Sequence, residues 1–266
     1  MKETKNTYAV VTGATSGIGY ELAKLCAQDG YNLIPVGRSG DELQRMQQEF
    51  SQQYGIQVVP MEKDLFDPNA AIEIHQEVRR QGLEVEILVN DAGQGVYGLF
   101  LESDIDRQLQ IIQLNISSLT VLTYLFAQDM VQRGSGRILQ LASIVSEVPS
   151  PYQAVYGGTK AFVLSFTEAL ISELKDTGVT VTALQPGATD TDFFNKAGAQ
   201  ESKIVQDKSK LADAAKVAKD GYEAMMRGDD KEVFGLKNKI QSAVSNIMPD
   251  TMLADNMKKQ SEPQNK

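Results

Sequence analysis

The amino-acid sequence predicts an α/β domain built on a doubly wound parallel sheet of about seven strands, with helices on both faces. Three observations predict this class. A short β-rich run, Tyr8–Thr12, is followed at once by a glycine-rich turn and a helical pattern. Short apolar runs then alternate regularly with helical patterns, which favours parallel strands joined by crossover helices. One run, Ile87–Val89, is apolar at every position, as expected of a strand that is buried on both faces.

The predicted elements follow one another without a linker, so we expect residues 1–260 to form one domain. The predicted strands cover residues 8–12, 32–36, 56–60, 87–89, 137–142, 179–184 and 232–236. The predicted helices run from the first turn to Gly30 and over residues 41–54, 68–81, 104–133, 156–175 and 211–227. Each helix assignment depends on apolar residues that recur at helical spacing.

The C-terminal part carries weaker patterns. Apolar residues recur at helical spacing at Leu236, Ile240, Val244 and Ile247, and a shorter stripe follows at Met252, Leu253 and Met257. We therefore expect helices over residues 236–260 that pack on the domain. A disordered tail is expected over residues 261–266, which are polar.

Composition excludes several classes of function. The net charge of −9 argues against a nucleic-acid or anionic-membrane partner, because nothing offsets phosphate repulsion. No signal peptide and no apolar run long enough to span a bilayer is evident, so we expect a cytoplasmic protein. The single cysteine, Cys26, falls on the apolar side of a helix and is expected to be an inert core thiol. The single histidine, His75, is expected at the surface. Tyr, Ser, Lys, Asp and Glu are left to carry any chemistry, and no metal is expected.

The glycine-rich turn, Gly13 to Gly19, lies between the first strand and the first helix. Glycines permit a tight turn and close approach of the backbone, and a helix N-terminus supplies N–H groups and partial positive charge. This context favours binding of a diphosphate. The alternative is a turn that merely closes a strand–helix unit, because the spacing G-x-x-x-G-x-G is not the commoner one.

The second strand ends at Gly37-Arg38, with no acidic residue at its end. In dinucleotide-binding folds an acid at this place holds the ribose hydroxyls, whereas an arginine accommodates a 2′-phosphate. Arg38 therefore indicates NADP(H), with NAD(H) as the alternative. A solvent-facing arginine at the end of a strand is the other interpretation.

Polar residues and glycines recur where the predicted strands end. Gly13, Arg38, Asp64, Asn90 and Ser143 all follow a predicted strand. Because ligands of such sheets bind at the carboxyl ends of the strands, these residues are expected to share one site.

A tyrosine and a lysine four positions apart, Tyr156 and Lys160, open a later helical pattern. Residues at this spacing share one face of a helix, so the lysine charge is expected beside the phenol and should lower its pKa. The pair indicates an acid/base device, with Ser143 as a hydrogen-bond donor to a carbonyl oxygen. The alternative is a half-buried tyrosine and a solvated lysine. Asn115, within an apolar helical pattern, is either structural glue or part of a polar relay.

These motifs, in this order, resemble those of the short-chain dehydrogenase/reductase family, whose members have a Rossmann-type domain. The resemblance covers residues 7–191. Thr12–Gly19 is similar to T-G-x-x-x-G-I-G, and Pro186–Thr191 is similar to P-G-x-x-x-T. Asn90–Gly93 is similar to N-N-A-G, with Asp91 in place of the second Asn. The separation of Ser143 and Tyr156, 156 − 143 = 13 positions, is typical of this family.

The resemblance implies a catalytic set and a cofactor site. The catalytic set is Asn115, Ser143, Tyr156 and Lys160. Tyr156 would exchange a proton with a carbonyl or alcohol, Ser143 would orient the oxygen, Lys160 would hold the nicotinamide ribose, and Asn115 would support a water relay. Ser16 departs from the Lys or Arg of many NADP-using members. The implied cofactor contacts are Gly13, Thr15, Ser16, Gly17, Ile18, Gly19, Arg38, Asp64, Leu65, Asn90, Ala92, Gly93, Tyr156, Lys160, Pro186, Gly187, Thr189 and Thr191.

The leading hypothesis is thus an NADP(H)-dependent oxidoreductase acting on a small-molecule carbonyl or alcohol, with a substrate lid over residues 192–226. One alternative is a dinucleotide-sensing or scaffold protein, which would not need the Tyr156 and Lys160 pair. Another is a sugar-nucleotide epimerase or dehydratase, which usually carries a larger C-terminal domain.

The family's members commonly assemble into dimers or tetramers, and the sequence is consistent with this. Two predicted helices, over residues 104–133 and 156–175, have apolar residues beyond one stripe, so each needs cover on a second face. These residues are Ile116, Val121, Phe126, Phe162, Phe166 and Leu170. We expect a homo-oligomer, and the alternative is that the C-terminal helices cover these faces.

Overall fold

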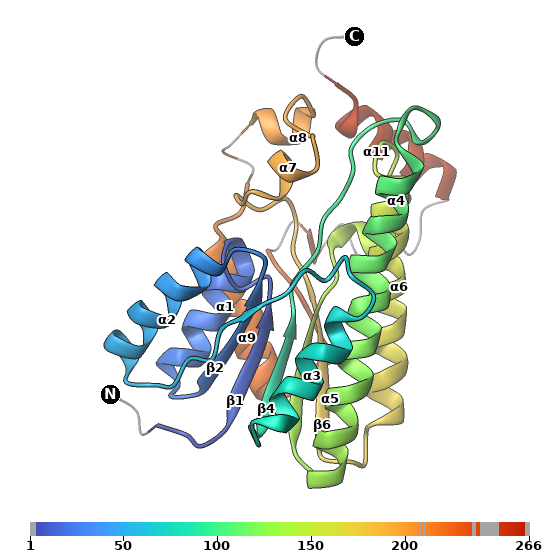
Figure 1. Cartoon of the computed structure of the whole chain (residues 1–266). Coiled ribbons are helices and arrows are strands. Elements are labelled where there is room, and N and C mark those ends of the chain that lie inside the picture. The colour runs from blue at the N-terminus through green and yellow to red at the C-terminus, as the bar shows by residue number, and fades with distance from the viewer. Residues whose placement is uncertain (1–3, 208, 210, 236–237, 240–249, 264–266) are drawn as a thin grey trace.

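Seven parallel strands form one sheet at the centre of the molecule (Figure 1). The computed structural model describes residues 4–207, 209, 211–235, 238–239 and 250–263. The sheet order is β3-β2-β1-β4-β5-β6-β7, which is the doubly wound arrangement that the sequence predicts. The strands are β1 (Tyr8–Thr12), β2 (Asn32–Gly37), β3 (Met61–Glu62), β4 (Val85–Asn90), β5 (Gly136–Leu141), β6 (Val179–Gln185) and β7 (Lys231–Val233).

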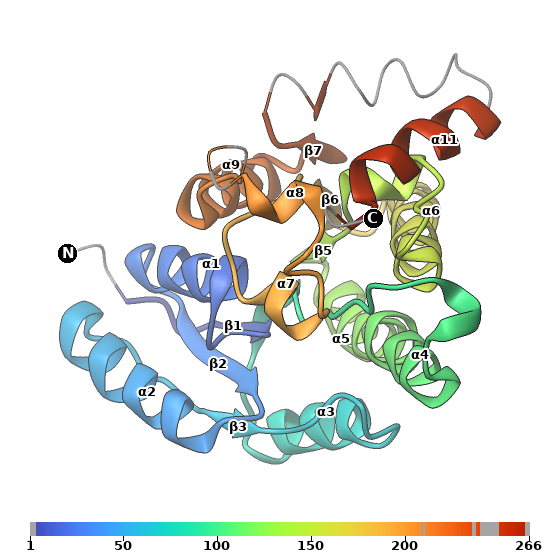
Figure 2. The same cartoon turned by 90° about the horizontal axis from the view of Figure 1, so that it is seen from above.

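Helices cover both faces of the sheet, as Figure 2 shows from above. One face carries α1 (Gly17–Gln28), α2 (Gly40–Tyr54) and α9 (Ala214–Arg227). The other carries α3 (Ala70–Arg80), α5 (Leu119–Arg133) and α6 (Ala154–Glu173). Each face of the sheet forms its own hydrophobic core with these helices, and alternate residues of one strand pack into the two cores. In β1, Ala9 and Val11 pack on the α1 side, and Tyr8 and Val10 pack on the α5 side.

The predicted third strand is interrupted. Val58 pairs with Leu33 in an isolated bridge, and β3 resumes three residues later, where Met61 pairs with Val36. Both pairs keep one register, so Pro60 falls opposite Pro35 of β2. The Leu33 N–H donates to Gln57 O on the neighbouring segment. The residue two positions later on the same side of β2 is Pro35, which has no N–H and cannot continue this pattern. The two prolines interrupt the hydrogen bonds between the strands. The predicted strand, residues 56–60, is therefore reduced to one bridge at Val58, and the regular strand starts later, at Met61.

The helix predicted over residues 104–133 is continuous but not regular. It comprises α4 (Ile105–Ile112), a six-residue π-helical segment η2 (Gln113–Ser118) and α5. By length and composition this helix of 29 residues could cross a membrane, and 44% of its most apolar window is buried. It is the one such helix among the residues that the structure describes, so the expected absence of an apolar run of that length needs correction. It is weak support for a membrane span, because a core helix of a globular domain meets the same criteria.

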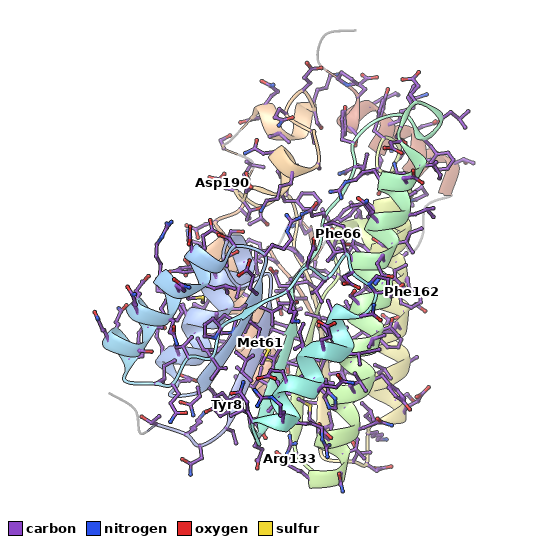
Figure 3. The ribbon with its side chains drawn as sticks, in the orientation of Figure 1. Tyr8, Met61, Phe66, Arg133, Phe162 and Asp190 are labelled. Carbon is purple, nitrogen blue, oxygen red and sulfur yellow. The ribbon has the colours of Figure 1, made fainter. Side chains whose placement is uncertain are left out.

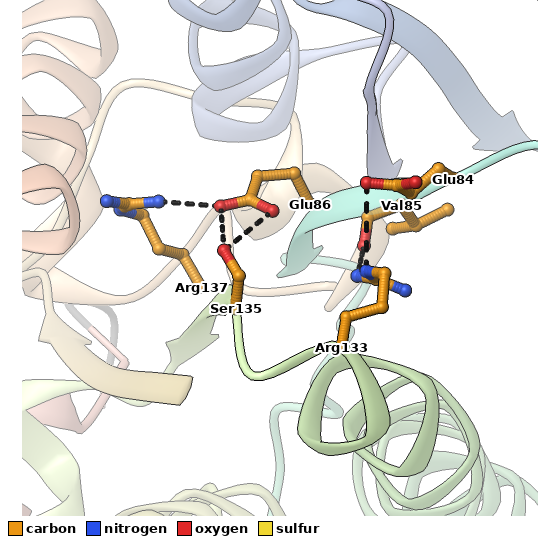
Figure 4. A network of polar contacts seen from close by, with 6 residues as sticks. All are labelled: Glu84, Val85, Glu86, Arg133, Ser135 and Arg137. Atoms are coloured by element: carbon orange, nitrogen blue, oxygen red, sulfur yellow. Dashed lines mark hydrogen bonds and ion pairs between the residues drawn. The ribbon is translucent and has the colours of Figure 1, made fainter. Parts of the chain in front are cut away.

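A polar network ties β4 to β5 at the amino ends of the strands (Figure 4). Arg137 pairs with Glu86 at 2.9 Å, and the Ser135 hydroxyl donates to the same carboxylate. Arg133 closes α5 by donating to Val85 O at 2.6 Å. Figure 3 places Arg133 at this end of the sheet and Phe66 and Asp190 at the opposite end, which carries the cleft described below.

Short helices and the C-terminal segment surround the carboxyl ends of the strands. They are η1 (Phe100–Glu102), η3 (Ile144–Glu147), α7 (Phe193–Lys196), α8 (Lys203–Gln206) and α11 (Asp250–Ser261). The predicted stripe over residues 236–247 lies almost wholly outside the described residues. Leu253 and Met257 of α11 pack on Val148. The predicted tail begins with an ordered part, because Pro263 bridges Ser202; residues 264–266 lie outside the described chain.

The single cysteine and the single histidine behave differently. Cys26 is buried, and burial raises the pKa of its thiol to about 12, which confirms an inert core residue. The surface position expected for His75 is wrong. Its side chain is only 12% exposed, it meets Asp129 at 2.8 Å, and its ring lies edge-on to Phe126.

Candidate active site

A cleft of about 890 Å³ lies at the carboxyl ends of the strands. The predicted residues that line it are Gly13, Thr15, Ser16, Gly17, Ile18, Arg38, Asp64, Leu65, Ala92, Gly93, Ser143, Tyr156, Lys160, Pro186, Gly187, Thr189 and Thr191. Three predicted residues, Gly19, Asn90 and Asn115, lie behind its walls. The structure therefore brings residues from seven separate segments to one cleft, as the strand-end positions predict.

The turn at the first helix presents free backbone N–H groups to this cleft. Ser16, the N-cap of α1, makes no side-chain cap hydrogen bond, and the first turn of α1 carries no acidic residue. By contrast, Ser39 caps α2 by accepting from the N–H of Glu42. Gly17 adopts a positive φ of 58°, which a side chain would disfavour. The positive end of α1 thus carries no cap from Ser16 and faces the cleft, which fits a dinucleotide diphosphate.

Asp91 lies directly against the glycine-rich turn. A Cβ at Gly13 would come within 3.0 Å of Asp91 Oδ2, and one at Gly19 within 2.5 Å. Its backbone N–H donates to Thr12 Oγ1 at 3.1 Å, and its carboxylate accepts the N–H of Gly19. Burial, opposed by Lys160 and by this hydrogen bond, raises the pKa of Asp91 to about 7. Asp91 therefore adds to the backbone contacts that favour glycine at 13 and 19.

The two asparagines behind the cleft hold its walls together. Asn90 donates to Thr123 Oγ1 and Gln140 Oε1, at 3.0 and 3.1 Å. Asn115, in the π-helical segment, accepts from Gln94 N–H and donates to Gln94 O and to Thr159 Oγ1. Asn115 thereby ties the loop after β4 to α6, one residue before Lys160.

Three polar side chains converge on the other wall of the cleft. Ser143 follows β5, and η3 begins there because its hydroxyl accepts from the Val145 N–H. Tyr156 and Lys160 lie one turn apart on α6, as their spacing predicts. Ser143 lies close enough to Tyr156 to lower the pKa of its phenol. The Lys160 ammonium donates to Leu141 O at 2.5 Å and lies 5.9 Å from the centre of the Tyr156 ring.

The electrostatics of this wall correct one expectation. Burial, with a smaller contribution from Asp91, raises the pKa of Tyr156 above its usual value, although Ser143 lowers it. Burial lowers the pKa of Lys160 to about 8, and Asp91 opposes this. The expected lowering of the phenol pKa by Lys160 is not seen, because the ammonium group is turned toward Leu141 O.

Aromatic side chains close over the phenol. The ring of Phe193, on α7, lies 5.0 Å from that of Tyr156, and Phe194 packs edge-on against Phe193. Val145 and Met257 add apolar surface to the same cleft. The cleft beside Tyr156 therefore suits an apolar molecule.

Arg38 lies where the sequence places it, at the end of β2. Its guanidinium group is exposed and stands 5.5 Å from the centre of the Phe66 ring, which Arg107 approaches at 4.9 Å. Asp64 accepts from the Phe66 N–H and so fixes this loop. An exposed arginine beside an aromatic ring can receive a phosphate without losing a structural ion pair.

The structure adds cleft residues that sequence reasoning missed. Gln153, one turn before Tyr156, has a buried amide nitrogen without a hydrogen-bond partner among the described residues. Asn238, which follows β7 in the chain, packs on Gly187, so this part of the C-terminal segment lies at the cleft. The position of Gln153 at helical spacing from Tyr156 could have indicated it. Nothing in the sequence around Asn238 could have done so.

Comparison with known proteins identifies the family. The family described as short chain dehydrogenase matches residues 7–202. A probable NADP-dependent dehydrogenase of Haemophilus influenzae is 36% identical over 196 residues, which cover 72% of this chain and 75% of that protein. A very-long-chain 3-oxoacyl-CoA reductase of Neurospora crassa is 35% identical over 66% of this chain, and the match spans only 54% of that protein.

A solved structure shows the same architecture over nearly the whole chain. A short-chain dehydrogenase from Sphingobium yanoikuyae in complex with NADPH superposes with a TM-score of 0.81 at 27% identity. The alignment covers 91% of this chain and 94% of that one. Together with the cleft and its Ser143, Tyr156 and Lys160 wall, these matches show that the chain belongs to the short-chain dehydrogenase/reductase family of oxidoreductases.

Proposed function

We propose that this protein transfers hydride between NADP(H) and a carbonyl or alcohol substrate, with Tyr156 as general acid and base. One observation carries the proposal: Ser143, Tyr156 and Lys160 line the same cleft that the glycine-rich turn and α1 open onto. The hydroxyls of Ser143 and Tyr156, which line one cleft, can bind one substrate oxygen together.

Each side chain then has a defined task. NADP(H) supplies or accepts the hydride when it is bound. In reduction, Tyr156 Oη gives its proton to the carbonyl oxygen, and the O–H bond of the alcohol forms as the phenolic one breaks. Ser143 Oγ donates to the same oxygen and orients it. Lys160 holds the nicotinamide ribose, and Asn115 supports a water relay that returns the proton from solvent.

NADP(H) is the cofactor that the site and the relatives favour. Arg38 can make charge-assisted hydrogen bonds to a 2′-phosphate. The Haemophilus relative is named NADP-dependent, and the Sphingobium structure contains NADPH. The residues of the cleft fit the rest of such a molecule, since Ser16 makes no side-chain cap hydrogen bond at the α1 N-terminus.

The substrate that the cleft favours has an apolar part and a second hydrogen-bond acceptor. Phe193, Phe194 and Met257 provide the apolar surface. The unpaired amide of Gln153 provides a donor one helical turn from Tyr156. Relatives named 3-oxoacyl-CoA reductases support a substrate of this kind, which carries a keto group close to a second carbonyl.

The test is NADPH consumption with a panel of ketones, aldehydes, quinones and 3-oxoacyl thioesters, repeated with Tyr156→Phe. General acid catalysis contributes about 10²–10⁴-fold, so kcat should fall at least about 10²-fold. NADPH affinity should change little, because the substitution removes one hydroxyl from the far wall. Tyr20→Phe is the matched control, since its hydroxyl donates to Glu49 outside the cleft.

Two results would contradict the proposal. A Tyr156→Phe protein that keeps its rate within a few-fold of the parent would remove Tyr156 from the chemistry. Tight NADPH binding without turnover of any compound in the panel would favour a dinucleotide-sensing protein instead.

We also propose that two copies associate through the outward faces of α5 and α6. An apolar groove runs between these helices, lined by Tyr124, Ala127, Val131, Phe166 and Leu170 among others. Ile116, Val121, Phe166 and Leu170 are half-buried, and Phe162 is 38% exposed. Phe126, which the sequence assigns to this face, is instead fully buried in the domain core. A symmetric partner is the simplest cover for such a groove.

A further inference from the structure

Asp91 is a carboxyl group in the cleft that the proposed reaction does not use. It stands where the family's N-N-A-G motif has an uncharged asparagine. The structure places its Oδ2 against the backbone of Gly13 and Gly19, with the Gly19 N–H as donor. The turn thus has a potential negative charge packed on the backbone that is also expected to hold a diphosphate.

Few other charges act on this carboxyl group. Lys160 and Tyr156 face it from α6. Residues 13–19 and 92–95 contain no ionisable side chain, and Asp190, on the loop after β6, is exposed. Arg38 and Asp64 line the same cleft from the segments after β2 and β3. The nearest compensation for a charged Asp91 is therefore the Lys160 ammonium.

We propose that Asp91 is a proton-linked positioning residue, whose carboxyl group takes up one proton from solvent when the diphosphate of NADP(H) binds at the N-terminus of α1. This inference rests on the proposed NADP(H) site. A charged Asp91 and a diphosphate would repel each other across a turn that has no charged side chain, and both would compete for the same helix end. Protonation removes one of the two charges.

Protonation of Asp91 also links binding to the catalytic wall. The negative charge of Asp91 raises the pKa of Tyr156 and of Lys160. When the carboxyl group becomes neutral, both pKa values fall. The phenol then gives up its proton more readily once the cofactor is in place.

The burial of Asp91 places this exchange in an accessible pH range. Burial raises the pKa of its carboxyl group to about 7 in the free protein, so at pH 8 the group is mostly ionised. Binding must then restore a proton, and affinity for NADPH falls as the pH rises above 7. In Asp91→Asn the amide can still accept from the Gly19 N–H, but no proton is exchanged.

The experiment is calorimetric titration of NADPH into the full-length parent, Asp91→Asn and Asp190→Asn proteins. At pH ~7.5 in buffers of different ionisation enthalpy, the parent and Asp190→Asn should take up roughly half a proton more than Asp91→Asn. Between pH 7 and 9 the parent dissociation constant should rise about fivefold if binding raises the pKa by one unit, and about 25-fold if it raises it by two. The dissociation constant of Asp91→Asn should change by less than about twofold over the same range. This figure excludes the effect of titration of the cofactor itself, which is common to all three proteins.

Parallel pH profiles for the parent and Asp91→Asn, with equal proton uptake, would overturn the inference. That result is separate from a failure of the proposed function, because the readout is binding and not turnover. A parent that shows the linkage but reduces no carbonyl compound would retain the inference and lose the proposed reaction. Thermal unfolding of the free proteins verifies that Asp91→Asn is folded.

Discussion

At the scale of the residue, single side chains decide what the strand ends bind. Glycine at 13 and 19 leaves room for Asp91, and Ser16 makes no side-chain cap hydrogen bond at the start of α1. The motifs could be predicted from the sequence because their residue types and order are specific. The charge state of Asp91, Tyr156 and Lys160 could not, because it depends on burial, which the sequence does not encode locally.

Arg38 gives a prediction at this scale. Arg38→Asp should weaken NADPH binding about 10- to 100-fold, because a charge-assisted hydrogen bond to the 2′-phosphate is lost and a repulsive charge is added. NADH binding should be unchanged or improved, since an aspartate can accept from ribose hydroxyls. Dissociation constants for both cofactors, measured by fluorescence titration, check this.

Arg45→Asp is the control for Arg38→Asp, because it makes the same charge change at an exposed position of α2. If the parent already binds NADH as tightly as NADPH, the assignment of Arg38 to the 2′-phosphate is wrong.

At the scale of the element, the irregular segments carry more information than the regular ones. The strands and helices were predictable because their apolar periods are strong. The break of the third strand at Pro60 was visible as a proline, but its position opposite Pro35 depends on a register that only the folded sheet sets. The π-helical segment around Asn115 could not be predicted, because its apolar pattern matches that of an ordinary helix. Such segments are often found at functional sites.

Asn115 gives the prediction for this element. Asn115→Ala removes the partners of the Gln94 N–H and C=O and of Thr159 Oγ1, all in a buried region. An unsatisfied buried group costs about 1–3 kcal/mol, so the free energy of unfolding should fall by at least ~1–3 kcal/mol. Urea unfolding followed by circular dichroism measures this.

Gln48→Ala, at an exposed position of α2, is the control and should change stability by less than about 0.5 kcal/mol. An equally small loss for Asn115→Ala would mean that Asn115 does not hold the loop to α6. Its place in a water relay would then be the only reason for its burial.

At the scale of the whole molecule, the two faces of the sheet are covered by helices, yet α5 and α6 keep an apolar groove on their outer side. The alternative expectation is that the C-terminal helices cover this groove. Within the described chain they do not, because α11 packs on Val148 and against α8 at the rim of the cleft. The sequence could indicate a second apolar face. It could not indicate that Phe126 belongs to the core, because helical spacing does not fix the rotation of a helix with apolar residues on several sides.

Phe166 gives the prediction for assembly. If copies pair through the groove, Phe166→Glu should shift the protein toward monomers, because it places an unpaired charge in an apolar contact. Light scattering during size exclusion at micromolar concentration measures the mass. Gln44→Glu, on α2 across the sheet, adds the same charge away from the groove and should leave the mass unchanged.

A single-chain mass for the parent protein would reject the oligomer outright. An oligomer that Phe166→Glu does not disturb would place the interface elsewhere on the molecule.

The broken third strand has a consequence for how folded copies behave when crowded together. A long free strand at the border of a sheet is a template on which other chains can stack into fibrils. Here one border is the two-residue β3, preceded by Pro60, which has no N–H, and the other is the three-residue β7. Within the described chain, neither border offers a long row of free N–H and C=O groups. The folded protein is therefore expected to resist fibril formation through its sheet, even at high concentration.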